Sequence, residues 1–133
     1  FYLLTYGDGI ANINIDKLIK FHKKNLGLVS MTVVRPPSRF GHLELSNNLV
    51  KKFREKSQID GVWINGGFMV VNKEFINYID DDDTFLEKEP LEKLAKQKKL
   101  FAFKHNGFWQ CMDTKRDKDF LDSIIKNKKI DLY

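Results

Sequence analysis

The first nine residues constrain the fold more than any other stretch, because a short apolar run ends abruptly at an acidic residue held between two glycines. Residues Phe1 to Tyr6 are almost all apolar or aromatic, and Gly7-Asp8-Gly9 follows directly. A run of this length closed by turn residues is typical of a strand buried on both faces of a helix-covered sheet. Asp8 is therefore expected near the carboxyl end of a central strand, where open α/β sheets bind ligands. The alternative is a simple turn that Asp8 caps.

The rest of the chain alternates predicted strands with predicted helices. Apolar runs predict strands over 28–34, 62–71, 100–104 and 108–112, with a hairpin over 41–45 and 49–53. Apolar periodicity and capping residues predict a first helix that Asn14 or Asp16 caps and that ends near Asn25 and Gly27. Further helices are predicted over 73–79 and 91–98, with a last one after Asp113. Strands mixed with helices in this way predict an α/β domain with a mixed sheet.

Length and composition favour one globular domain. The chain has 133 residues, of which 42% are hydrophobic and 31% charged. No apolar run approaches the roughly 20 residues of a membrane helix and no signal peptide is visible, so no membrane partner is expected. The single Cys111 excludes an internal disulfide and is compatible with a reducing compartment. We therefore expect a cytoplasmic location. Because Phe1 opens directly into a core strand, residues 1–133 are expected to be the later part of a longer domain.

The net charge of +5 does not by itself predict a nucleic-acid partner. Of the 23 basic residues, 19 are Lys, and most alternate with apolar residues at helical spacing, as on solvated helix faces. A nucleic-acid surface gains support from Arg and exposed aromatics in one stripe, whereas this chain has only four Arg. We therefore expect no nucleic-acid partner and, instead, attraction of small anionic substrates.

Two carboxylates stand out by position. Asp8 and Asp113 each follow a short apolar strand and precede a turn into a helix. If those strands are neighbours, the two side chains converge at one edge of the sheet. Mg²⁺ is usually held by one or two carboxylates together with substrate phosphates, which such a pair would supply. The alternative for Asp113 is the N-cap of the last helix.

Other residues are weaker candidates. Lys56 could serve as a point charge for a phosphate, although Glu55-Lys56 also fits a surface ion pair. Asn65-Gly66-Gly67 interrupts an apolar strand, which indicates that a backbone or a ligand comes close. Gly41 has the same character, and a bulge or a strand crossing would explain either site without a ligand. The three histidines lack metal-ligand spacing and are expected at the surface or the core edge.

Six short motifs occur in an order that is specific even though each is weak alone. They are Leu4-Thr5-Tyr6-Gly7-Asp8-Gly9, Pro36-Pro37-Ser38-Arg39-Phe40-Gly41, Glu55-Lys56, Ile64-Asn65-Gly66-Gly67-Phe68, Glu89-Pro90-Leu91 and Phe108-Trp109-Gln110-Cys111-Met112-Asp113-Thr114. Over nearly all 133 residues the chain resembles the sugar-1-phosphate nucleotidylyltransferases, and within that family most closely the glucose-1-phosphate cytidylyltransferases.

The resemblance implies a Rossmann-like nucleotide-diphospho-sugar transferase fold with a mixed, mostly parallel sheet. It implies Mg²⁺-dependent transfer of a cytidylyl group from CTP to glucose 1-phosphate, giving CDP-glucose and pyrophosphate. The CDP-glucose would serve the synthesis of surface polysaccharides such as lipopolysaccharide O-antigen. A homo-oligomer is compatible with this function. By motif match, Asp8 and Asp113 would bind the metal, Lys56 the sugar phosphate, and Gly7 would lie against the nucleotide. The residues implied to line the sugar pocket are Gly41, Glu55, Asn65 and Gly66.

Two departures from the family pattern bear on activity. The family's glycine-rich amino-terminal loop, which cradles the triphosphate, is absent, and Ser57 stands where the family usually has Pro. The chain alone is therefore expected to be inactive. The alternatives are a thymidylyl- or uridylyltransferase acting on a hexose 1-phosphate, a metal-dependent glycosyltransferase, and a non-catalytic sugar-phosphate-binding domain of the same fold.

Overall fold

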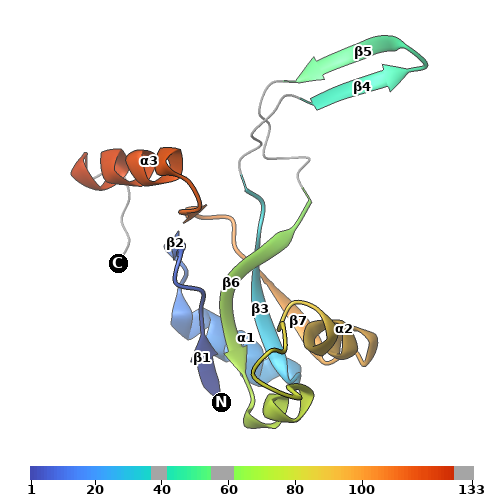
Figure 1. The fold of residues 1–133 in the computed structure, drawn as a ribbon, viewed down its shortest axis with the longest axis vertical. Helices are drawn as coiled ribbons and strands as arrows, with labels where there is room; N and C mark the ends of the chain where they lie inside the picture. Colours follow the sequence, from blue (N-terminus) through green and yellow to red (C-terminus); the bar gives the residue numbers. More distant parts are fainter. Residues whose placement is uncertain (37–41, 55–61, 128–133) are drawn as a thin grey trace.

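A four-stranded sheet forms the centre of the computed structural model, which describes residues 1–36, 42–54 and 62–127 (Figure 1). Its strands lie in the order β1 (Tyr2–Leu4), β6 (Ile64–Val71), β3 (Val29–Val34) and β7 (Leu100–Lys104). β6 is antiparallel to both of its neighbours, while β3 and β7 are parallel, so that β1, β3 and β7 all run in one direction. The prediction of a mixed α/β sheet is confirmed, although two of the three strand pairs in this described sheet are antiparallel rather than parallel.

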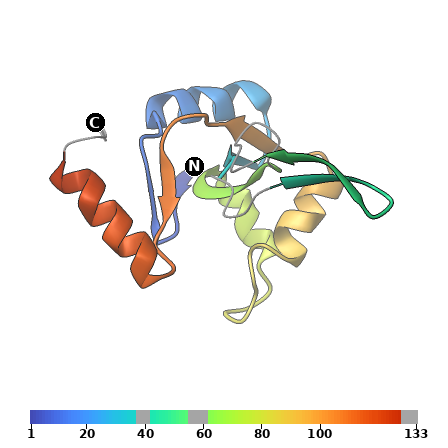
Figure 2. The ribbon, with the colours of Figure 1, turned by 90° about the horizontal axis from the view of Figure 1, so that it is seen from above.

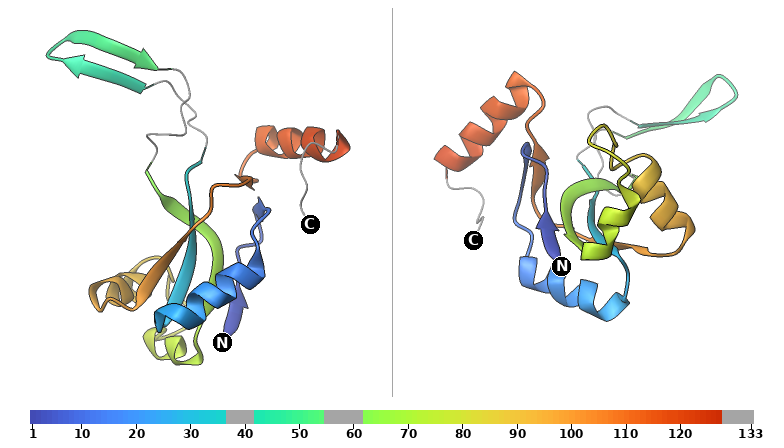
Figure 3. Two further views of the ribbon diagram at one scale, coloured as in Figure 1. Left: turned by 180° about the vertical axis from the view of Figure 1, so that it is seen from behind. Right: turned by 60° about the horizontal axis from the view of Figure 1, so that its bottom comes forward.

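Helices cover both faces of this sheet (Figures 2 and 3). Helix α1 (Ile15–Asn25) lies on one face, and the 3₁₀ helix η1 (Lys73–Tyr78) and helix α2 (Glu89–Lys96) lie on the other. Helix α1 begins where the sequence predicts, because the Asn14 side chain accepts a hydrogen bond from the Lys17 backbone N–H at 2.8 Å. Helix α2 carries Pro90 in its first turn, where the missing N–H costs nothing.

The core lies mainly between the sheet and the two helices η1 and α2. Val29 and Met31 of β3 pack there with Met69 and Val71 of β6 and, from the helices, with Phe75, Leu91 and Leu94. Five of the six residues of β3 are fully buried and the sixth is half-buried, as expected for a strand with helices on both faces.

The opposite face of β3 carries a buried polar network that corrects one expectation. His22 of α1 is only 4% exposed, rather than at the surface or the core edge. Its Nδ1 pairs with Ser30 Oγ at 2.9 Å and its Nε2 with Asn72 Oδ1 at 3.1 Å. Because both ring nitrogens have partners, the burial of this side chain is tolerated.

The position of β1 also differs from the expectation. Within the described part of the chain, β1 pairs only with β6 and is an edge strand, with Tyr2 and Leu3 67% and 56% exposed. Successive side chains of a strand project from opposite faces of the sheet, so the exposure of Tyr2 and Leu3 shows that both faces of β1 are open there. Asp8 therefore does not end a central strand; it lies in the turn between β1 and β2 (Gly9–Ala11).

Two two-stranded ladders and one helix of the described chain lie beyond the sheet. β2 pairs with β8 (Trp109–Cys111), and β4 (His42–Ser46) pairs with β5 (Leu49–Arg54) as the predicted hairpin, with Asn47 at φ 51° in its turn. Helix α3 (Lys115–Lys126) follows β8. None of the described helices is long and apolar enough to cross a membrane.

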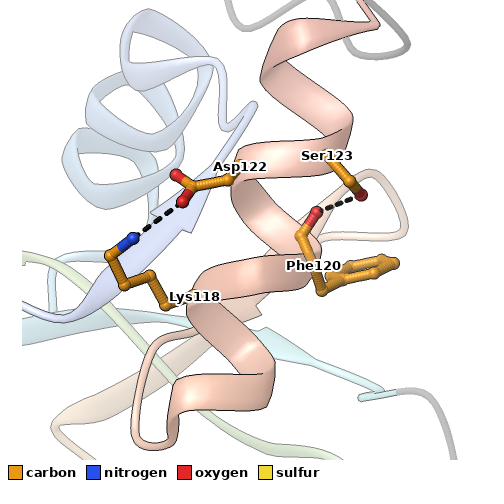
Figure 4. Close-up of polar contacts among 4 residues, drawn as sticks. All are labelled: Lys118, Phe120, Asp122 and Ser123. Carbon is orange, nitrogen blue, oxygen red and sulfur yellow. Dashed lines mark hydrogen bonds and ion pairs between the residues drawn. The ribbon is translucent and has the colours of Figure 1, made fainter.

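Helix α3 presents the solvated charged surface that the lysine spacing predicts. Lys118 and Asp122, one turn apart, form an ion pair of 2.7 Å, and Ser123 Oγ donates a hydrogen bond to the Phe120 carbonyl at 2.7 Å (Figure 4). The hydrogen bond that Lys118 donates to Asp122 lowers the pKa of Asp122 and raises the pKa of Lys118. Both groups are exposed, so the pair mainly keeps this face polar.

Candidate functional site

A short antiparallel ladder brings the two predicted metal carboxylates onto neighbouring segments. In the β2–β8 pair, Gly9 lies opposite Cys111 and Ala11 opposite Trp109. The ladder continues toward the turn, where the Met112 N–H donates to the Asp8 carbonyl at 2.9 Å. Asp113, the next residue, is therefore adjacent to the Gly-Asp-Gly turn. The two segments become neighbours through β2, a strand the sequence analysis did not predict, and not through direct pairing of β1 with β8.

The structure excludes the capping role considered for Asp113. Thr114 is the N-cap of α3: its hydroxyl accepts a hydrogen bond from the Asp117 N–H at 3.2 Å, and Asp117 accepts one from the Thr114 N–H at 3.0 Å. This reciprocal capping box satisfies the first turn without Asp113. The Asp113 carboxylate instead accepts a weak hydrogen bond from the Cys111 thiol at 3.3 Å, and it is exposed to solvent. Helix capping therefore does not account for a carboxylate at this position.

Asn65 links β6 to the end of β1. Its Nδ2 donates to the Tyr6 hydroxyl at 2.9 Å, and its Oδ1 accepts from the Gly67 N–H at 2.9 Å. The Tyr6 hydroxyl in turn donates to Glu87 Oε1 at 2.5 Å. The side-chain amide of Asn65 thus organises the protein itself, and its contacts with the described residues use one of its two N–H groups and one of its two oxygen lone pairs.

The two glycines of β6 have different structural roles. Gly67 adopts φ +83°, and a Cβ there would lie 2.8 Å from the Tyr6 ring. A Cβ on Gly66 would lie 3.0 Å from Val34 and 3.1 Å from the Thr32 carbonyl, and the Gly66 carbonyl accepts the Trp109 indole N–H at 2.9 Å. Close backbone approach, one of the two explanations open for this motif, is therefore present without a ligand.

Among the described tyrosines, Tyr6 has a strongly raised pKa. Its pKa is raised from 10.0 to about 12, chiefly by burial and next by the hydrogen bond to Glu87, while the hydrogen bond from Asn65 opposes the rise. The negative charges of Glu87 and Asp8 add to the rise. The protonated phenol is therefore the form that this network stabilises.

We expect Tyr6→Phe to remove the most alkaline step from the tyrosinate absorbance titration. Tyr6 ionises near pH 12 when folded but near pH 10 when unfolded, so its contribution to stability is complete below pH 10 and is lost as the pH rises toward 12. The control, Tyr2→Phe, removes an exposed phenol and should leave that step in place. A titration of Tyr6→Phe that superimposes on the wild type at its alkaline end would contradict this assignment.

The predicted site residues are only partly covered by the described structure. Gly7 is exposed, with no atom within 4 Å of the position a Cβ would take. Gly41, Glu55 and Lys56 lie outside the described residues. Sequence reasoning did not single out Glu87 or the hydroxyl of Tyr6, because their contact joins residues 81 positions apart.

The donor set suits a hard cation held jointly with a substrate. Among the described residues, no group of three His, Cys, Asp or Glu side chains could hold a metal by itself. Two carboxylates on adjacent segments are what Mg²⁺ needs when substrate phosphates and water complete its coordination. The acidic run Asp80 to Asp83 is a turn, in which Asp81 accepts from the Asp83 N–H and the Thr84 hydroxyl. Asp8 and Asp113 thus remain the predicted metal ligands.

Known proteins share these features of sequence and fold. No family model matches the chain. The chain is 47% identical over 128 residues to the glucose-1-phosphate cytidylyltransferase of Salmonella typhi, covering 96% of this chain and 50% of that protein. It is 34% identical over 131 residues to the mannose-1-phosphate guanyltransferase of Saccharomyces cerevisiae, covering 94% of this chain and 36% of that protein.

A solved structure supports the fold. A Bacillus anthracis protein described as a glucose-1-phosphate thymidylyltransferase, in complex with sucrose, superimposes with a TM-score of 0.64 over 94% of this chain and 54% of that chain. Its sequence identity of 14% restricts this likeness to the fold. The chain spans about half the length of the Salmonella relative, and less of the yeast one. The similarity over nearly the whole chain, the motif order and the fold together show that it belongs to the sugar-1-phosphate nucleotidylyltransferase family.

Proposed function

We propose that this chain supplies the sugar-phosphate-binding and metal-binding part of an enzyme that transfers a cytidylyl group from CTP to glucose 1-phosphate. The observation that carries the proposal is the β2–β8 ladder, which brings the Asp8 turn beside the segment of Asp113. The higher identity to the cytidylyltransferase, 47% against 34% for the guanyltransferase, favours CTP as the donor.

The reaction is an in-line displacement at phosphorus. A phosphate oxygen of glucose 1-phosphate attacks the α-phosphorus of CTP, the bond to the bridging oxygen of the β-phosphate breaks, and pyrophosphate leaves. No protein nucleophile is required, so the protein contributes positioning and charge neutralisation. Mg²⁺ held by Asp8 and Asp113 would supply charge neutralisation at the reacting phosphates.

The remaining residues would position the sugar and its phosphate. Asn65, fixed by Tyr6 and by the Gly67 N–H, would offer its second amide hydrogen and second lone pair to sugar hydroxyls. The family resemblance places Gly66 beside the sugar, and the exposed Gly7 would allow the nucleotide to approach the backbone. Lys56 would pair with the sugar phosphate, with Glu55 and Gly41 beside the sugar. These roles follow from the family resemblance.

The test is to fuse the chain to the half of the Salmonella typhi relative that it does not match. We expect the fused protein to release pyrophosphate from CTP and glucose 1-phosphate faster than with dTTP, UTP or GTP. The chain by itself should release none. A fused protein that unfolds cooperatively on heating, yet releases no pyrophosphate with any of the four nucleotides, would overturn the proposal.

A further inference from the structure

Glu87 contacts the candidate site from a turn that is itself anchored to the protein. Leu86, the residue before it, packs against the core, and the Leu86 carbonyl accepts a hydrogen bond from the Leu91 N–H at 3.1 Å. The Glu87 side chain is exposed, and its Oε1 accepts the hydrogen bond from the Tyr6 hydroxyl. An anchored turn thus directs a carboxylate at the residue that immediately precedes Gly7-Asp8.

The hydrogen bonds around the Tyr6 hydroxyl have a fixed direction. A carboxylate can only accept, so the hydroxyl hydrogen of Tyr6 is committed to Glu87. The Tyr6 oxygen is then left as an acceptor, and Asn65 turns its Nδ2 toward it at 2.9 Å. With the nitrogen on this side, Oδ1 lies on the other, where it accepts from the Gly67 N–H at 2.9 Å. The carboxylate of Glu87 therefore favours one of the two orientations of the Asn65 amide.

Asn65 depends on such side-chain bonds because β6 is irregular beside it. The register of β3 with β6 passes from Met31 opposite Met69 to Val33 opposite Asn65, which leaves β6 with two extra residues between these pairs. A bulge interrupts the ladder and re-aims the side chains next to it. The regular strand therefore does not by itself fix the direction of the Asn65 side chain, and its hydrogen-bond partners complete the task.

We propose that Glu87 is a positioning residue, which acts through the Tyr6 hydroxyl to hold the Asn65 amide in the orientation that receives the hexose of the sugar phosphate. The inference rests on the proposed function, which puts Asn65 beside the sugar. Without an acceptor at position 87, the Tyr6 hydroxyl can rotate and donate to Asn65 Oδ1 instead of accepting from Nδ2. The reversed amide would set Nδ2 against the Gly67 N–H, donor against donor. Asn65 would then spend less time in the orientation that binds the sugar.

The kinetic test compares variants of the fused protein. Glu87→Leu removes the acceptor but keeps a side chain of similar size. We expect it to raise KM for glucose 1-phosphate about three- to tenfold, the effect of one net hydrogen bond, and to change kcat and KM for CTP by less than about twofold. Glu87→Gln keeps an acceptor oxygen and should recover most of the affinity.

The matched control is Glu89→Leu. It removes the same charge two residues later, from an exposed ion pair with Lys93 of 2.8 Å. Because exposed pairs contribute little, this variant should change KM for glucose 1-phosphate by less than about twofold. Equal KM values for Glu87→Leu and Glu89→Leu would overturn the proposal.

A double-mutant cycle tests the route through Tyr6. If Glu87 acts through the phenol, then adding Glu87→Leu to Tyr6→Phe should change KM for glucose 1-phosphate by less than about twofold, since the hydroxyl that connects it to Asn65 is already absent. Effects of the two substitutions that multiply would overturn the proposal, because Glu87 would then act on the sugar by another route.

Nuclear magnetic resonance of the chain itself gives a readout that does not depend on turnover. The Asn65 side-chain amide is identified as the pair of signals that disappears in Asn65→Asp. Glu87→Leu should shift this pair, because the Tyr6 oxygen beside Nδ2 is no longer committed to accepting, whereas Glu89→Leu should leave it in place. If the fused protein shows no turnover but Glu87→Leu shifts the pair, the positioning stands and the proposed reaction fails. A pair that does not shift overturns the positioning itself.

Discussion

Replacing either predicted metal carboxylate, by Asp8→Asn or Asp113→Asn, is expected to reduce turnover by the fused protein by about 10²–10³-fold. The amide keeps the size and polarity of the side chain but removes the negative charge that binds a hard cation. A loss of this size is typical when one group that stabilises developing charge is removed. Turnover is measured as pyrophosphate release from CTP and glucose 1-phosphate.

Metal binding by the chain itself gives a readout that does not depend on turnover. Mn²⁺ accepts the same oxygen ligands as Mg²⁺, and its free fraction can be followed by electron paramagnetic resonance. We expect each substitution to weaken Mn²⁺ binding by at least about tenfold, since each removes one of two anionic ligands. The control is Asp119→Asn, which removes an equal charge from the exposed surface of α3.

The stability of these variants distinguishes a functional carboxylate from a structural one. Thr114 and Asp117 already cap α3, and Asp8 contributes its backbone carbonyl, not its side chain, to the β2–β8 ladder. Both asparagine variants should therefore unfold at the urea concentration of the wild type. If Asp113→Asn instead unfolds earlier and keeps the Mn²⁺ affinity of Asp119→Asn, the carboxylate is structural and the metal assignment fails.

The elements that the sequence predicted correctly are those whose signals are local. Asn14 lies just before an apolar-periodic segment, and its side chain does cap α1. Ser46-Asn47-Asn48 lies between two short apolar segments, and Asn47 adopts the positive φ that such a turn requires. In both cases the residue that determines the geometry is next to the element it determines, so no distant contact was needed to predict it.

The features that the sequence did not predict depend on contacts between distant segments. The three-residue strand β2 is too short to show periodicity, and it exists because Gly9 to Ala11 pairs with residues about a hundred positions later. That the segments of Asp8 and Asp113 are neighbours was predicted, but through the wrong strands. The burial of His22 could not be predicted from its own side chain, because it depends on the hydrogen-bond partners Ser30 and Asn72.

Gly67→Ala is expected to destabilise the protein by about 2–5 kcal/mol. A residue with a Cβ loses about 1–2 kcal/mol in the left-handed region, and Gly67 has φ +83°. The new methyl group would also lie 2.8 Å from the Tyr6 ring, and overpacking of this kind typically costs about 1–3 kcal/mol. The measurement is the free energy of unfolding in urea. Gly7→Ala is the matched control, because nothing lies within 4 Å of its Cβ position; its stability should change by no more than about 1 kcal/mol.

A second substitution separates the two causes and links them to the site. In Tyr6→Ala the aromatic ring is absent, so adding Gly67→Ala to that variant should cost only the backbone part, about 1–2 kcal/mol. The difference measures the steric contact between β6 and the end of β1. If Gly67→Ala costs the same with and without the Tyr6 ring, the ring does not pack against Gly67. Asn65 would then be positioned by its hydrogen bonds to the Tyr6 hydroxyl and the Gly67 N–H, without support from packing of the Tyr6 ring against Gly67.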